Sequence, residues 1–392
     1  MLKAATKTLN DFLENMKKEN ATPNSKNRRS FLRGALTAGA AVAGTSALSS
    51  QNLLAQRRVG STGGRLTSGD VAILKFLAAA ELIEADLWQQ YAELGGLTPG
   101  QQPVETAPFT PMNGYQAALM NLDSDGPQYI SSNNLDEQSH AQFLNAYLTM
   151  RGETPVNLDQ FRTLPSSMAT GAQQIGRLTN LMQLTIDTSW YTRYHSSTNP
   201  DLGATYAQAI PALANGAFQA IPKTDADFAP ADRAQALANT AAFHFGFIEQ
   251  GGSSLYATLA QQVSDAEVLR ILLSIGGDEV AHFLEWVDFS GNGVQTPIAP
   301  VTDPVSGLTF PNFDATVNPL LQTNLIFPVP CEFISSSLPL VAIVRPTGKG
   351  QIDAVGAVNA LTADGLFIGQ SPSFIQLLLE MAFAADEAIR GF

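Results

Sequence analysis

Apolar positions recur every three or four residues through much of the chain between residues 66 and 289, and this spacing predicts α-helices. Helix-stop residues such as Gly95, Gly96 and Gly152 divide the pattern into segments. The helices are expected at about 68–94, 128–151, 170–194, 234–263 and 264–289. The pattern therefore predicts an all-α core.

Local capping signals mark the start of two helices. Ser264 and Glu267 form a capping box at the start of the fifth segment. Ser371 followed by Pro372 predicts the start of a last helix that reaches about Arg390.

The segments between and after the helices are rich in turn-forming residues. The connections 95–127 and 195–233 carry many Pro, Gly, Asn and Thr residues, and the proline-rich stretch 293–349 predicts loops with short extended pieces. We therefore expect a four-helix bundle with long insertions over 66–292. A mixed extension over 293–392 is expected to pack on the bundle and to end in a helix.

The pattern Asp-Glu-x-x-His occurs twice, at 136–140 and at 278–282. Residues three apart lie on one face of a helix, so each Glu and His can bind a common metal ion. A carboxylate oxygen combined with an imidazole nitrogen suits iron or manganese. The candidate ligands from the two motifs are Glu137, His140, Glu279 and His282.

Two further glutamates complete a ligand set for two metal ions. Glu84 and Glu249 lie on other predicted helices, and each precedes a tyrosine by seven residues, Tyr91 or Tyr256. Glu81, one turn before Glu84, is the alternative first ligand, and the tyrosine spacing favours Glu84. The tyrosines are packing residues by default; they could also hydrogen-bond a ligand or carry an oxidising equivalent. Two Glu-x-x-His helices plus one Glu from each of two others form the ligand set of di-metal helix bundles.

The aspartate of each motif has a predicted role as well. A metal-bound imidazole normally donates its second N–H to a carboxylate. The symmetry of the repeat predicts that Asp136 accepts from His282 across the bundle and that Asp278 accepts from His140.

Surface ion pairing is the alternative interpretation of the two motifs. The second motif, however, lies on an apolar stripe at helical spacing. That stripe consists of Leu272, Ile275, Glu279, His282, Trp286 and Phe289. Charged residues that face a core need partners, and a pair of metal ions provides them.

These motifs resemble those of bacterioferritin and rubrerythrin, which pair a Glu with a Tyr seven residues later and carry Glu-x-x-His helices. The stretches RLTNLMQLTIDTSW, FHFGFIEQGGSSLY and LRILLSIGGDEVAHFLEW also resemble ferritin-like proteins described as desiccation-related. The resemblance covers most of residues 66–392 and implies a ferritin-like fold with a di-metal site. The long insertions and the C-terminal extension would obstruct a 24-subunit cage, so a monomer or a small homo-oligomer is expected.

Charge divides the chain into two parts. The net charge is −13, yet residues 1–55 are basic, so the remainder is more acidic than the total suggests. Such a surface repels nucleic acid and anionic lipid.

Arg28 and Arg29 in NRRSFLRG, followed by a weakly apolar stretch, resemble a twin-arginine export signal. Residues 1–55 are therefore expected to be an export signal, with Ala47 and Ala55 as the alternative positions for cleavage. The protein is expected in the periplasm or another extracytoplasmic space. Beyond them no apolar run is long enough to span a membrane.

Together these features predict an exported protein with two iron or manganese ions that reacts with dioxygen or a peroxide. Glu137 and Glu279 are expected to bridge the metals, with Glu84 and Glu249 as terminal ligands. Two alternatives stay open. One is a manganese catalase-like peroxide dismutase, and the other is a non-enzymatic metal-binding protein that protects against desiccation or stress.

Overall fold

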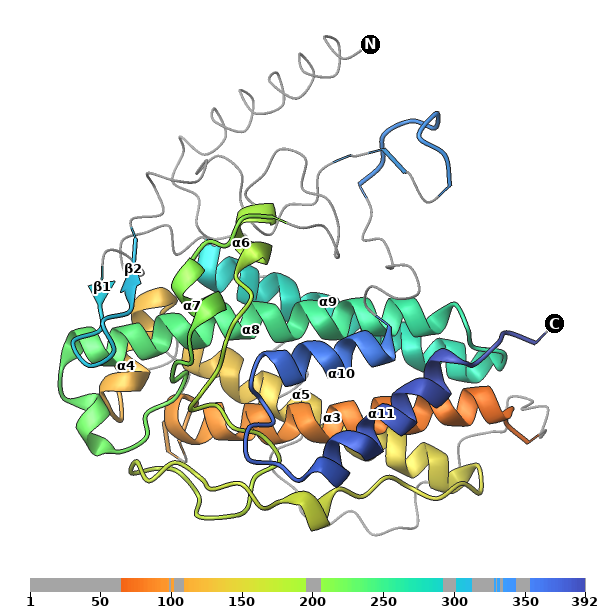
Figure 1. Ribbon diagram of the computed structural model, residues 1–392, viewed down its shortest axis with the longest axis horizontal. Coiled ribbons are helices and arrows are strands. Elements are labelled where there is room, and N and C mark those ends of the chain that lie inside the picture. The colour runs from red at the N-terminus through yellow and green to blue at the C-terminus, as the bar shows by residue number, and fades with distance from the viewer. Residues whose placement is uncertain are drawn as a thin grey trace. The chain divides into compact units, whose positions relative to one another are not determined.

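The fold is described here from a computed structural model, and the all-α prediction is confirmed (Figure 1). The structure describes residues 65–98, 100–101, 109–194, 206–291, 301–311, 328, 330–331, 334–342 and 353–391. The predicted export signal lies outside these residues. In the part of the chain that is described, no helix is long and apolar enough to cross a membrane.

Four long helices form the bundle: α3 (Ser68–Gly95), α5 (Gly126–Met150), α8 (Ala231–Ala260) and α9 (Ala266–Gly291). They pack mainly as two pairs, α3 with α5 and α8 with α9. Their inner faces carry most of a continuous apolar core. All four are helices that the apolar spacing predicted.

Shorter elements surround the bundle. The helix α4 (Gly114–Leu122) lies within the connection 95–127 and packs on α5 and α8. The other elements between the bundle helices are η1 (Asp159–Phe161), α6 (Ser189–Tyr194), α7 (Pro211–Asn215) and η2 (Asp225–Phe228). The C-terminal extension begins with β1 (Val301–Thr302) and β2 (Thr309–Phe310). The two strands pair antiparallel, with Val301 opposite Phe310.

Two helices of the C-terminal extension cover the bundle. The predicted last helix is α11 (Pro372–Asp386), and the Ser371 side chain caps it by accepting from the Phe374 amide. It lies against α3. The helix α10 (Ala354–Ala363), which the sequence pattern did not predict, contacts α11 and α8. Figure 1 shows α10 and α11 (blue) lying over α3 and α8.

The predicted helix over 170–194 is wrong for most of its length, because only Ser189–Tyr194 is helical. Its backbone groups bond to distant segments instead of to one another. The amides of Leu178 and Thr179 donate to the Asp86 carboxylate, at 3.0 and 2.9 Å. The amides of Asn180 and Thr185 donate to carbonyls in the loop that follows α10 and at its end. Tertiary hydrogen bonds thus replace the helical ladder.

The predicted capping box at Ser264 is also wrong. The side chain of Asp265 caps α9 by accepting from the amides of Glu267 and Val268. The Ser264 amide donates to Asp70 near the start of α3, at 2.8 Å. This contact ties the start of α9 to the start of α3.

Candidate metal centre

The four bundle helices bring six ligand-type side chains together in the core. They fall into two groups, in each of which the ligand atoms lie within 4.8 Å of one another. The first group is Glu81, Glu137, His140 and Glu279. The second group is Glu137, Glu249, Glu279 and His282. Glu137 and Glu279 belong to both groups, which is the arrangement that carboxylates bridging two ions require.

The first group surrounds Nδ1 of His140. This atom lies 3.4 Å from Glu81 Oε2, 3.4 Å from Glu137 Oε2 and 3.5 Å from Glu279 Oε1. The helices α3, α5 and α9 each supply one of the carboxylates. A cation between these atoms would therefore be held from three helices.

The second group surrounds Nδ1 of His282 in the same way. That atom lies 3.1 Å from Glu137 Oε1 and 3.5 Å from Glu249 Oε2. The two imidazole rings have their centroids 6.2 Å apart. The sequence repeat thus appears in the structure as an approximate twofold arrangement.

The outer nitrogen of each imidazole faces the aspartate of the other motif. His140 Nε2 lies 3.2 Å from Asp278 Oδ2, and His282 Nε2 lies 3.5 Å from Asp136 Oδ2. The symmetry of the repeat predicted these pairs. Asp278 forms a hydrogen bond with His140, whereas Asp136 lies beside His282 without one. Both imidazoles present Nδ1 to the cluster of carboxylates.

Burial of four glutamates at one point perturbs their ionisation. Desolvation, together with the charge of Glu137, raises the pKa of Glu81 to about 7. Desolvation and the surrounding carboxylates raise the pKa of Glu279 well above its usual value, and burial also raises that of Glu249. Without a cation, burial and mutual repulsion favour the protonated form of these groups.

Glu137 behaves in the opposite way. Burial acts to raise its pKa, but hydrogen bonds from His140 and His282 outweigh burial and lower the pKa to about 2. Burial acts to lower the pKa values of both histidines, and their carboxylate partners nevertheless raise them. The cluster therefore holds positive charge as imidazolium ions and protons, and two divalent cations can replace that charge.

The hydrogen bonding of the cluster is incomplete in a way that suits metal ligands. Among the described residues, Glu81 Oε2, Glu249 Oε2 and both Glu279 carboxylate oxygens are buried and have no hydrogen-bond partner. A buried carboxylate oxygen without a partner is costly. Coordination would satisfy all four, and oxygen and imidazole donors in this proportion fit iron or manganese.

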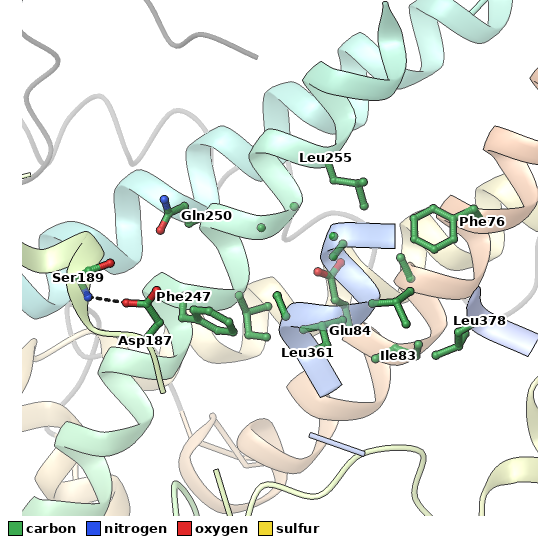
Figure 2. A pocket seen from close by; sticks show the side chains of 18 of the residues that line it. Phe76, Ile83, Glu84, Asp187, Ser189, Phe247, Gln250, Leu255, Leu361 and Leu378 are labelled. Atoms are coloured by element: carbon green, nitrogen blue, oxygen red, sulfur yellow. Dashed lines mark hydrogen bonds between the residues drawn. The ribbon is translucent and has the colours of Figure 1, made fainter. Parts of the chain in front are cut away.

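Glu81, rather than Glu84, is the α3 residue within the two groups. Glu84 is less completely covered than Glu81 because it lines a neighbouring cavity, as Figure 2 shows. Its pKa is raised well above the usual value by burial and by the charges of Glu279 and Glu137. Glu84 therefore lies close to the cluster without a place in either group.

The two tyrosines that follow Glu84 and Glu249 by seven residues have different partners from each other, and neither hydrogen-bonds Glu84. Tyr256 donates a hydrogen bond to Glu81 Oε1, so this tyrosine does contact a ligand group. Tyr91 instead bonds His244 Nδ1 at 2.8 Å, and His244 Nε2 donates to Asp364 at 3.0 Å. Tyr91 thus belongs to a buried chain that joins α3, α8 and the end of α10.

Asn133 is a contributor to the site that the sequence motifs did not reveal. Its amide nitrogen donates to Glu137 Oε1 at 2.8 Å and to Glu249 Oε1 at 3.3 Å. Its oxygen accepts from the Trp286 indole at 2.6 Å. The available signal was its position one helical turn before Glu137.

Comparisons with known proteins agree with this architecture. A family model for the ferritin-like domain matches residues 69–286, which include all four bundle helices except the last residues of α9 and the first of α3. No curated protein and no solved structure matches the chain. Since the match covers more than half of the chain, this protein belongs to the ferritin-like domain family.

Proposed function

We propose that this chain binds two iron or manganese ions and performs redox chemistry with dioxygen or a peroxide. The observation that carries the proposal is the pair of overlapping ligand groups that share Glu137 and Glu279. Four carboxylates and two imidazoles balance the charge of two divalent ions. When bound, such a pair of metals supplies the electrons for reduction of dioxygen or peroxide.

The protein side chains have definite tasks in this proposal. Glu81 with His140 and Glu249 with His282 would each hold one ion, and Glu137 and Glu279, which belong to both groups, would hold both. Asp136 and Asp278 hold the imidazoles in the tautomer that presents Nδ1. Burial of the cluster excludes bulk water from the reacting centre.

The first experiment is elemental analysis of the purified protein, with metal counted per chain. Close to two iron or manganese ions supports the proposal, whereas zinc alone argues against redox chemistry. Absence of metal even after anaerobic reconstitution with ferrous iron overturns the proposal.

Glu279→Ala and His282→Ala should each lose at least one ion. Glu380→Ala, at an exposed position on α11, is the matched control.

Turnover assays distinguish the neighbouring functions. Sustained oxygen release from peroxide would favour a manganese catalase-like dismutase. Stoichiometric oxidation of ferrous iron without turnover would favour a protein that sequesters metal or protects against desiccation or stress.

We further propose export by the twin-arginine route, supported by Arg28, Arg29 and the weakly apolar stretch that follows. Replacing both arginines by lysine should retain the protein in the cytoplasm, while Arg33→Lys should leave export intact. Export of the double variant at the normal level would contradict the assignment.

We also propose a monomer or a small homo-oligomer. The helices α10 and α11 cover parts of α3 and α8, so those surfaces are not free for contacts with other subunits. Light scattering of the purified chain tests this, and a 24-subunit mass would overturn it.

A further inference from the structure

A cavity of about 330 Å³ lies between α3 and α8, beside the metal-ligand cluster. Residues of α10 and α11 line it as well, so the C-terminal extension forms one of its walls. Its volume is in the range of small-molecule sites. Most of its lining is apolar, and the larger apolar side chains are Phe76, Ile83, Phe247, Leu255, Leu361 and Leu378. Figure 2 shows them around the space.

One end of the cavity meets the cluster. Gly252 of α8 lines the cavity, and a Cβ atom on this residue would lie 2.2 Å from Glu279 Oε2. The wall at this point is therefore bare backbone in contact with a proposed bridging ligand. Glu84, whose charge interacts with that of Glu279, also lines the cavity (Figure 2).

The other end of the cavity is polar. Asp187 accepts from the Ser189 amide at 2.8 Å and from Gln208 at 2.9 Å, and all three residues line the cavity. Arg193 also lines this end, so charges of both signs are present. At the metal end the described lining offers one ionisable side chain, Glu84, and no cationic group. An anionic ligand would find no partner in the lining there, whereas the apolar side chains suit an uncharged one.

We propose that this cavity binds an uncharged, largely apolar organic molecule and holds it against the metal centre. The inference rests on the proposed function for the use of that molecule as a substrate, while binding itself needs no metal. The apolar lining supplies the affinity. Gly252 lines the cavity and also contacts Glu279, so a molecule at this end lies beside the cluster.

Gly251 offers a way to fill the cavity without touching the ligands. It lines the cavity, and an added Cβ would meet no atom within 4 Å. Leucine at this position favours the helix more than glycine does, so Gly251→Leu should fold. Gly277 is a matched control, because it lies on α9, is exposed and also has open space around an added Cβ.

The probe is phenylnaphthylamine, an uncharged dye whose fluorescence rises in apolar sites, titrated into metal-free protein. We expect saturable binding to the wild type, about tenfold weaker binding to Gly251→Leu, and unchanged binding to Gly277→Leu. The sulfonated dye anilinonaphthalene sulfonate, which has the same aromatic body with a negative charge, should bind less tightly than the uncharged dye.

Equal affinity of the wild type and Gly251→Leu for phenylnaphthylamine would overturn the proposal. Tighter binding of the sulfonate would overturn the preference for an uncharged ligand. Metal content of the same three proteins is measured in parallel. Dye binding without metal uptake would refute the proposed function alone, whereas metal uptake without dye binding would refute the cavity alone.

Discussion

At the scale of single residues, the metal centre depends on which side of α3 a glutamate occupies. Glu81 and Glu84 are three positions apart, about 60° around the helix. Glu81 faces His140 and accepts from Tyr256, while Glu84 faces the apolar cavity. The sequence spacing alone could not resolve this difference, because both glutamates lie near the same apolar stripe.

Glu81→Gln should therefore lower the metal content towards one ion per chain, because the first group loses its α3 carboxylate. Glu84→Gln should leave two ions bound, since Glu84 belongs to neither group. Elemental analysis of both variants after identical reconstitution checks this. The reverse result would return Glu84 to the ligand set.

Tyr91→Phe should destabilise the fold without removing metal. The substitution removes the hydroxyl that donates to His244 Nδ1 and leaves this buried nitrogen without its partner. The expected loss is about 1–3 kcal/mol in the free energy of unfolding, measured by denaturant titration. Tyr129→Phe, at a partly exposed position, should change stability by less than about 0.5 kcal/mol. Equal losses in the two variants would contradict the assigned role of Tyr91.

At the scale of elements, the periodic spacing of apolar residues was sufficient to predict the four bundle helices. The two Asp-Glu-x-x-His motifs fixed α5 and α9, and the apolar stripes located α3 and α8. The stretch 170–188 carries apolar residues at helix-like spacing, but Asp86 binds two of its amides and prevents a helix. Asp86 is distant in sequence, so local pattern could not reveal this competition.

The close approach of α8 to α9 depends on Gly252. A methyl group at this position would lie 2.2 Å from Glu279 Oε2, so Gly252→Ala should displace the bridging carboxylate. We expect metal affinity to fall by about tenfold or more, as seen when groups that position metal ligands are altered. Gly251→Ala, the neighbouring position with open space, should bind metal normally. Isothermal titration with manganese compares them, and equal affinities would contradict the predicted steric conflict.

The connection between α4 and α5 should give the protein a pH-dependent stability. Burial, a hydrogen bond with Asp125 and the charges of Asp125 and Asp288 raise the pKa of Asp123 to about 7. The folded chain holds this proton more tightly than the unfolded chain, so the stabilisation is present below about pH 4 and is lost as the pH rises through about 7. Asp123→Asn keeps an acceptor for the Asp125 amide.

Asp123→Asn should therefore be more stable than the wild type at about pH 8, by about 1 kcal/mol because the site is partly exposed. The difference should close near pH 4. Thermal unfolding across this pH range measures it. Parallel profiles for the two proteins would show that Asp123 does not ionise as described.

At the scale of the whole molecule, the proposed metal centre joins the two helix pairs of the bundle. Each ligand group takes side chains from both pairs: α3 and α5 with α9 in the first, and α5 with α8 and α9 in the second. The packing within the pairs is more extensive than the packing between them. Metal bound at this point would therefore act as a crosslink between the two pairs, in addition to the aromatic contacts of Trp88 with Phe245 and Trp286.

Metal binding should consequently raise the thermal stability of the whole bundle. A cation that binds the folded chain alone, at a concentration 100-fold above its Kd, adds about 2.7 kcal/mol per site. Two such sites add about 5 kcal/mol, which for a domain of this size corresponds to a rise in Tm of roughly 10 °C. Calorimetry of the metal-free protein with and without manganese measures the shift. Glu279→Ala, which breaks both groups, should abolish it, and Glu380→Ala should retain it.

Because the crosslink joins the pairs, the amides of the facing surfaces of α5 and α9 should gain the most protection from hydrogen exchange. A rise in Tm with no protection there would show that the metal binds elsewhere on this acidic chain.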